Sequence, residues 1–186
     1  MTPRFDVYAI LDPSALPVPS AWEDAAPRVL AAGVGVVQLR DKHSSAAELV
    51  RRARRLTALC DAHDATCIVN DRLDVALAAG AHGVHLGPED ISIGDARRVA
   101  PGLLIGGSAG TPERAVLLVD QGADYLGVGA LYDASASKPN ASMPRGPDVV
   151  RDVLRVVDVP VVGIGGITAE TIPDVRAAGA SGVAVL

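Results

Sequence analysis

The sequence is poor in aromatic residues, in cysteine and in excess basic charge. Aromatic side chains make up only 3% of the 186 residues, so the core has to be built from Val, Leu, Ile and Ala. The two cysteines, Cys60 and Cys67, show no C-x-x-C spacing and no histidine tract, which favours two buried thiols in a reducing compartment. The 17 Lys and Arg against 22 Asp and Glu give a net charge of −5, and no basic stripe indicates a nucleic-acid partner.

Long apolar runs are missing as well. No run approaches the ~20 residues that a membrane span requires, and residues 1–6 lack the apolar segment of a signal peptide. We therefore expect a cytoplasmic protein with neither a membrane nor a nucleic acid as partner. What is abundant is short apolar sequence: 49% of the residues are hydrophobic, which suffices for one domain over residues 1–186.

Short apolar runs rich in β-branched residues alternate with segments of helical spacing along the whole chain. The runs cover residues 6–11, 34–39, 66–69, 83–86, 103–105, 125–128, 159–164 and 182–186. Strands buried on both faces have this nearly continuous apolar character. Eight such runs predict a (β/α)8 TIM barrel, with an open doubly wound sheet as the alternative. The sequence ends at Leu186, in or just after the last run, so we expect a barrel without its last helix.

Polar residues mark where the predicted helices begin. Ser44, Thr111 and Thr168 each precede a segment of helical spacing and are suitable N-cap residues. Pro112 follows Thr111, at the first helical position where proline is favoured.

In a barrel of this type the active site lies at the carboxyl ends of the strands. The second predicted strand ends in Gln38, Arg40 and Lys42, which alternate and therefore point to one side of the strand. Two cations and an amide are suited to binding a diphosphate, with Arg forming forked contacts and Lys acting as a point charge. The alternative is a solvated strand end that carries an ion pair.

Acidic residues follow the third and fourth predicted strands. Asp71 and Asp90 are placed to share one Mg²⁺ ion, which prefers oxygen ligands and bridges to substrate phosphate. Equally, each aspartate is positioned to cap the helix that follows it. His85 precedes Asp90 in the same motif, and we expect it inside the barrel or behind the first layer of site residues.

Glycine-rich segments close the later strands. Ser108 follows a glycine pair, and Gly165 and Gly166 precede Thr168 in a turn that we expect to lead into a helix N-terminus, where an anion is favoured.

A long irregular stretch, residues 130–145, follows the sixth strand. Its Ser135, Ser137 and Lys138 place hydroxyls and an amine on a loop that either closes over substrate or is merely a polar connection.

Taken in order, these motifs resemble the thiamine phosphate synthase/thiazole tautomerase family. The resemblance rests on QLRDK at 38–42, NDR at 70–72, GVHLGPED at 83–90, GS at 107–108, DYLGVG at 124–129 and GIGGIT at 163–168. It runs from about Tyr8 to Leu186. The resemblance implies a (β/α)8 transferase with phosphorylated small-molecule substrates. Such an enzyme uses Mg²⁺ as cofactor to join hydroxymethylpyrimidine diphosphate to a thiazole phosphate, giving thiamine phosphate and pyrophosphate.

The resemblance also implies a role for each matching residue. Contacts to the pyrimidine and its diphosphate fall on Gln38, Arg40, Lys42 and Asn70, and the Mg²⁺ ligands are Asp71 and Asp90. Ser108 corresponds to a pyrophosphate contact, Gly165 and Gly166 to the turn near the thiazole phosphate, and Ser135, Ser137 and Lys138 to a Thr-x-Thr-Lys loop. The groups expected to act in catalysis are Arg40, Lys42, Ser108 and Lys138.

Two other functions stay open at this stage. The tautomerase branch of the family has a histidine after the sixth strand, where this sequence has Ala130, so the synthase is favoured. A barrel that binds thiazole phosphate or thiamine phosphate without turnover is the other alternative. Homo-oligomer formation is a further open possibility, because the predicted barrel ends are uncovered.

Overall fold

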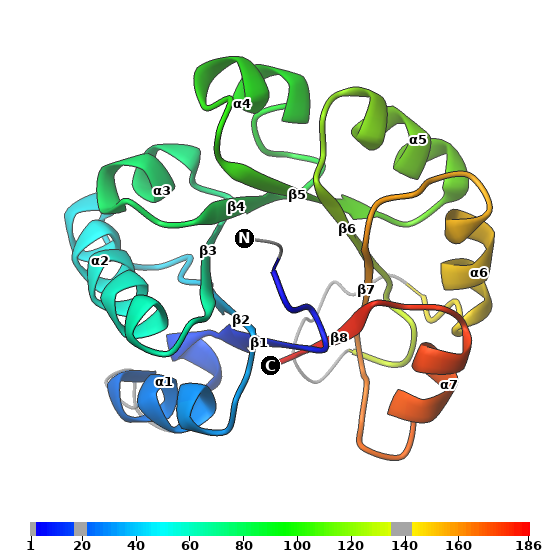
Figure 1. The fold of residues 1–186 in the computed structure, drawn as a ribbon, viewed down its shortest axis with the longest axis horizontal. Helices are drawn as coiled ribbons and strands as arrows, with labels where there is room; N and C mark the ends of the chain where they lie inside the picture. Colours follow the sequence, from blue (N-terminus) through cyan, green and yellow to red (C-terminus); the bar gives the residue numbers. More distant parts are fainter. Residues whose placement is uncertain (1–2, 17–21, 135–142) are drawn as a thin grey trace.

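The computed structural model describes residues 3–16, 22–134 and 143–186. Eight parallel strands close into a barrel in sequence order, with β8 pairing back onto β1 through Tyr8 and Ala184 (Figure 1). The strands are β1 (Val7–Leu11), β2 (Val36–Leu39), β3 (Thr66–Asn70), β4 (Gly83–Leu86), β5 (Leu104–Ala109), β6 (Tyr125–Val128), β7 (Val161–Ile164) and β8 (Gly182–Val185). The predicted (β/α)8 barrel is confirmed, and the open doubly wound sheet is excluded.

Helices cover the outside of the barrel (Figure 1). They are η1 (Pro13–Ala15), α1 (Trp22–Ala31), α2 (Ala46–Ala62), α3 (Leu73–Ala79), α4 (Ile93–Val99), α5 (Pro112–Asp120), α6 (Asp148–Leu154) and α7 (Ile172–Ala177). Within the described ranges, no helix has the length and apolar character needed to cross a membrane.

One of the three predicted N-cap residues is confirmed, and the other two are wrong by one to three residues. Thr111 caps α5 as predicted, but α2 is capped by Ser45 and not by Ser44. Thr168 is not the cap of α7 either, because the N-cap position belongs to Thr171. The Thr171 hydroxyl accepts the Thr168 N–H at 2.9 Å, so Thr168 lies in a turn that precedes the helix.

The core has two parts with different composition. Between the sheet and the helices, the buried side chains are almost all aliphatic, as the low aromatic content predicts. Inside the barrel, however, a second cluster is built around Phe5, Tyr8 and Tyr125. The rings of Phe5 and Tyr125 have centroids 4.9 Å apart, and Gly106 leaves the space they need, since a Cβ there would lie 2.1 Å from Tyr125 Cζ. Three of the five aromatic residues thus lie in the barrel interior, whereas Trp22 and Tyr132 pack in the outer cluster.

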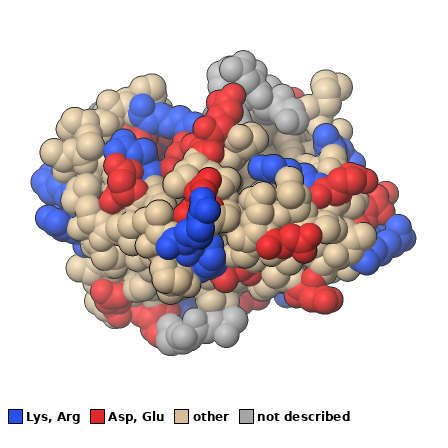
Figure 2. All heavy atoms as spheres, turned by 90° about the horizontal axis from the view of Figure 1, so that it is seen from above, with Lys and Arg blue, Asp and Glu red and all other residues tan. Residues whose placement is uncertain are grey.

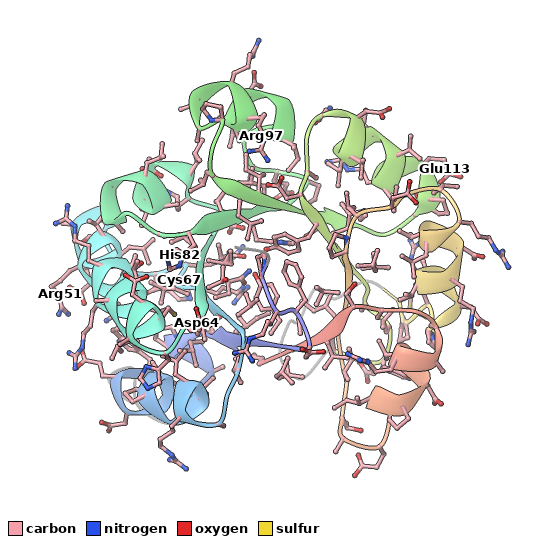
Figure 3. The ribbon with its side chains drawn as sticks, viewed as in Figure 1. Arg51, Asp64, Cys67, His82, Arg97 and Glu113 are labelled. Carbon is pink, nitrogen blue, oxygen red and sulfur yellow. The ribbon has the colours of Figure 1, made fainter. Side chains whose placement is uncertain are left out.

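A single arginine holds the turns before β5 and β6. Arg97 of α4 donates to the carbonyl oxygens of Leu103 at 2.7 Å and Gly122 at 2.8 Å, and it pairs with Asp124 at 2.6 Å (Figure 3). Asp124 in turn accepts the Ile105 N–H at 2.7 Å. Since these groups precede the strands, this network stabilises the amino end of the barrel and leaves the carboxyl end to other residues.

Candidate active site

Arg40 is anchored by a buried carboxylate at the end of β1. The Arg40 N–H continues the ladder to Leu11 at 3.0 Å, and its guanidinium pairs with Asp12, a residue only 4% exposed. The other oxygen of Asp12 accepts the Ser14 N–H at 2.9 Å and the Ser14 hydroxyl at 2.6 Å. Because Ser14 holds the buried Asp12 carboxylate in place, the pairing with Asp12 restricts the orientation of the Arg40 guanidinium.

Asp12 was not anticipated from the sequence. The available signal was its position directly after the first predicted strand, level with Arg40 on the neighbouring strand. A single aspartate in a Leu-Asp-Pro-Ser segment also suits an ordinary turn, and Asp12 does cap η1.

The alternation predicted after β2 is present in the structure. Gln38 is buried and its amide donates to the Tyr8 hydroxyl at 2.7 Å, whereas Lys42 pairs with Asp71 at 3.2 Å. Asp41, between Arg40 and Lys42 in sequence, instead binds Arg52 of α2. Gln38, Arg40 and Lys42 therefore contact groups of the neighbouring strands, while Asp41 fastens the strand end to a helix.

The contacts of Asp41 also fix its charge. Burial opposes its ionisation, but hydrogen bonds from Ser44 and His43 and the charge of Arg52 outweigh this and hold the pKa of Asp41 below its ordinary value.

Asp71 and Asp90 lie side by side at the ends of β3 and β4. Their carboxyl groups are within hydrogen-bonding reach of each other, and Asp90 also accepts the Gly87 N–H at 2.7 Å. Burial, reinforced by the nearby Asp71 carboxylate, raises the pKa of Asp90 above its ordinary value. Asp71 has a positive φ of 63° and donates its N–H to the His85 carbonyl at 2.8 Å, which ties the end of β3 to β4.

Neither aspartate acts as the helix cap that the alternative interpretation required. The N-cap of α3 is Arg72, without a side-chain capping bond, and the N-cap of α4 is Ser92, whose hydroxyl accepts the Asp95 N–H at 3.0 Å. The two carboxylates are therefore available to a cation.

No third His, Cys, Asp or Glu joins this pair anywhere in residues 3–16, 22–134 and 143–186. A donor set of two carboxylates suits Mg²⁺, which commonly takes its remaining ligands from water and substrate phosphate.

His85 connects the acidic pair to Ser108. Its Nε2 lies 3.0 Å from the Ser108 hydroxyl, and its Nδ1 lies 3.2 Å from the Tyr125 hydroxyl inside the barrel. Enclosure of the ring lowers the pKa of His85 to about 4, against a smaller opposing effect of Asp71. The imidazole is therefore neutral near pH 7, and the prediction that His85 is an interior residue is confirmed. Asn70 is its register neighbour on β3.

The Gly165–Gly166 turn packs against the segment that follows β6. Tyr132 donates its N–H to the Gly165 carbonyl at 2.9 Å, and a Cβ on Gly166 would lie 2.3 Å from the Asp133 carbonyl oxygen. The two glycines have φ values of 98° and 64°, which only glycine adopts readily.

The glycine turn does not lead directly into a helix N-terminus, because α7 begins only at Ile172. The prediction of an anion site at that helix end is therefore wrong in its geometry. The Gly165 and Gly166 N–H groups donate no hydrogen bond to another backbone group of the described residues. The remaining predicted residues, Ser135, Ser137 and Lys138, lie outside the described residues.

The surface of the barrel carries charges of both signs. On the side drawn in Figure 2, acidic and basic side chains are interspersed without a continuous basic stripe. The basic side chains Arg40 and Lys42 at the strand ends are therefore positioned by their individual ion pairs, and not by a broad basic surface.

Together, these groups define a (β/α)8 barrel whose carboxyl end gathers an arginine, a lysine, two adjacent carboxylates and a glycine turn. The chain belongs to the thiamine monophosphate synthase family, whose model matches residues 7–186. Membership of this family makes it a transferase of thiamine biosynthesis.

Individual relatives cover most of the chain. It is 48% identical to a thiamine-phosphate synthase of Methanospirillum hungatei over 84% of its own length and 76% of the relative's. It is 44% identical to that of Methanocella arvoryzae over 98% and 86%. Among solved structures, thiamine phosphate pyrophosphorylase from Pyrococcus furiosus superimposes with a TM-score of 0.87 and 34% identity, covering 98% of this chain and 85% of that one.

Proposed function

We propose that the protein is a Mg²⁺-dependent thiamine phosphate synthase. In this reaction the bond between the hydroxymethyl carbon of the pyrimidine and its diphosphate oxygen breaks, and the electron pair leaves with pyrophosphate. The thiazole nitrogen then donates its lone pair to the pyrimidine cation, forming the new C–N bond of thiamine phosphate. The observation that carries this proposal is the convergence of Arg40, Lys42, the Asp71–Asp90 pair and Ser108 at one end of the barrel.

The demand of the reaction is to stabilise negative charge as pyrophosphate departs. Arg40, fixed by Asp12, supplies a planar pair of donors, and Lys42 supplies a compact charge beside Asp71. Ser108 adds a hydroxyl from β5. Preorganised donors of this kind are each worth roughly 100-fold or more in rate.

Asp71 and Asp90 are the residues that would hold Mg²⁺. The bound ion would neutralise charge on the diphosphate oxygens and so improve pyrophosphate as a leaving group. The raised pKa of Asp90, which burial causes first and the nearby Asp71 carboxylate reinforces, supports this assignment, because a bound cation would relieve both effects.

The remaining predicted residues bind the two organic groups. Gln38 and Asn70 are assigned to the pyrimidine, at the barrel interior behind the cationic groups. The backbone amides of Gly165 and Gly166 are assigned to the thiazole phosphate, across the barrel mouth. Ser135, Ser137 and Lys138 are assigned, by family resemblance alone, to a loop that completes the site.

The decisive experiment measures pyrophosphate release from both substrates with and without Mg²⁺. Release is expected only with the metal, and Asp71→Ala and Asp90→Ala are each expected to reduce it by about 100-fold or more while the circular dichroism spectrum is retained. Undiminished release in either variant would contradict the metal assignment. A folded protein that thiamine phosphate stabilises thermally, but that releases no pyrophosphate, would be a binding protein instead.

A further inference from the structure

Five side chains from five strands form one continuous hydrogen-bonded chain across the barrel interior. The distances are 2.7 Å from Gln38 Nε2 to the Tyr8 hydroxyl, 3.0 Å from Tyr8 to Tyr125, 3.2 Å from Tyr125 to His85 Nδ1, and 3.0 Å from His85 Nε2 to Ser108 Oγ. Gln38, Tyr8 and Tyr125 are at most 4% exposed, so bulk water does not compete for the inner bonds.

The backbone is adapted to this chain. A Cβ at Gly106 of β5 would lie 2.1 Å from the Tyr125 ring, and a Cβ at Gly127 of β6 would lie 3.1 Å from the His85 ring. Two strands thus present glycine where a side chain would collide with the Tyr125 ring or crowd the His85 ring. The polar chain therefore occupies space that is reserved for it.

The Gln38 end determines which atom donates in every hydrogen bond of this side-chain network, because each hydroxyl has one hydrogen and a neutral imidazole has one N–H. When the Gln38 amide donates to Tyr8, the Tyr8 hydrogen is directed to Tyr125 and the Tyr125 hydrogen to His85 Nδ1. A neutral imidazole that accepts at Nδ1 carries its proton on Nε2, and it donates that proton to Ser108 Oγ. The Ser108 hydrogen is then free to point into the barrel mouth.

The opposite direction would give Ser108 the opposite character. An acceptor at position 38 would draw the Tyr8 hydrogen, leave His85 protonated on Nδ1 and commit the Ser108 hydrogen to Nε2. Ser108 would then turn lone pairs toward the mouth, which disfavours an anion. The direction set by the Gln38 amide is the one that suits a phosphate-binding end.

We propose that Gln38, through Tyr8, Tyr125 and His85, sets the tautomer of His85 and thereby presents Ser108 as a hydrogen-bond donor to the anion. The role of Ser108 toward the anion rests on the proposed function above, whereas the coupling of position 38 to the His85 tautomer does not. Tyr8, Tyr125 and His85 are in this sense positioning residues, acting through Ser108.

The direct test is the tautomer of His85, read from the two ring-nitrogen resonances of protein labelled with ¹⁵N-histidine. The resonances are assigned by their loss in His85→Gln among the four histidines of the chain. Wild type is expected to carry the proton on Nε2. Gln38→Glu, studied at a pH high enough to ionise the buried carboxyl, offers only acceptors to Tyr8 and is expected to reverse the chain, so that the proton moves to Nδ1.

Two further variants make the result specific. Combining Gln38→Glu with Tyr8→Phe cuts the chain, so the glutamate should no longer change the tautomer. Ser108→Ala leaves the chain intact on the Gln38 side, so Nε2 should keep its proton. A wild-type ring protonated on Nδ1, a Gln38→Glu tautomer equal to wild type in folded protein, or a change in Ser108→Ala would each overturn the proposal. Should Gln38→Glu not fold, Tyr125→Phe provides the test: it must abolish the exclusive Nε2 tautomer.

Kinetics give an independent arm. Tyr125→Phe is expected to lower kcat for pyrophosphate release by about 5- to 10-fold, but to have no added effect in a Ser108→Ala background, because it acts through Ser108. Additive losses would contradict this route. If the protein released no pyrophosphate at all, the proposed function would fail while the tautomer measurements still decided the coupling.

Discussion

The anchoring of Arg40 by Asp12 is the contact whose removal should cost the most stability at the carboxyl end of the barrel. In Asp12→Asn the carboxylate that faces the guanidinium is lost, while the amide oxygen can still accept the Ser14 N–H, 2.9 Å away in the native protein. The substitution therefore isolates the charge of Asp12 from its role as a cap of η1.

The magnitude follows from the burial of the two partners. Breaking a fully buried ion pair costs about 3–5 kcal/mol, and breaking an exposed one costs about 0–1 kcal/mol. Asp12 is 4% exposed and the Arg40 side chain 25%, so the pair lies between these limits. We expect the free energy of unfolding in urea to fall by about 1–3 kcal/mol, measured by circular dichroism at pH 7.5. We also expect a higher KM for the pyrimidine diphosphate, because Arg40 is no longer held in place.

Asp148→Asn is the matched control. Its carboxylate also pairs with an arginine, Arg151, but the Asp148 side chain is 79% exposed. This change is expected to alter the unfolding free energy by no more than about 0.5 kcal/mol. Equal effects of Asp12→Asn and Asp148→Asn would refute the argument from burial.

Three further predictions concern the same end of the barrel. The raised pKa of Asp90 indicates that its charge is disfavoured in the fold. Asp90→Asn should therefore raise the thermal midpoint of the metal-free protein while abolishing Mg²⁺-dependent turnover. Glu89→Gln, which changes an exposed neighbouring residue, should have neither effect. Gly166→Ala should lower the free energy of unfolding in urea by at least about 2 kcal/mol, since the new Cβ clashes with the 130–134 segment and the φ is unfavourable for alanine. Gly80→Ala, where φ is 69° but the surrounding space is open, should lower it by about 1 kcal/mol. The pKa of His85 is lowered in the fold from 6.5 to about 4, so the unfolded chain binds its proton first as pH falls. Its contribution is complete above pH 6.5 and is lost toward pH 4, so wild type should lose up to about 2 kcal/mol more than His85→Gln between pH 7 and pH 5; equal pH dependence would contradict this.

The fold was predictable because its signals are local. Strands buried on both faces read as continuous apolar runs, and helical spacing follows each run except the last, so the number and order of strands are predicted directly. The errors lie at boundaries. The sequence predicts the fifth strand at 103–105, whereas β5 extends to Ala109. Gly106 and Gly107 suggest a loop in the sequence, but in the barrel both lie within the strand. The caps at Ser44 and Thr168 were displaced for a similar reason: adjacent hydroxyl residues cannot be ranked without knowing the turn.

Candidate site residues could be predicted where they belong to a short motif at a strand end. Contacts between residues on distant strands could not be predicted. Arg40, Lys42, Asp71 and Asp90 are proposed from the sequence because they follow predicted strands, and the barrel does bring these strand ends together. The bond between Tyr8 and Tyr125 joins residues 117 positions apart, and each tyrosine alone reads as a core aromatic. Only the closed order of the strands brings them together, so no local pattern could have indicated the interior chain.

The two ends of the barrel divide stability and function between them. At the amino end, Arg97 satisfies several carbonyl groups and a carboxylate at once, an arrangement that stabilises the fold. At the carboxyl end, Asp71 adopts a positive φ beside a second carboxylate, and the amides of the Gly165–Gly166 turn have no backbone partner among the described residues. Each of these features opposes stability in the free protein, and under the proposed function each would become favourable when a cation or a phosphate binds. On this proposal the carboxyl end is preorganised for its ligands, at the expense of stability that the rest of the barrel supplies.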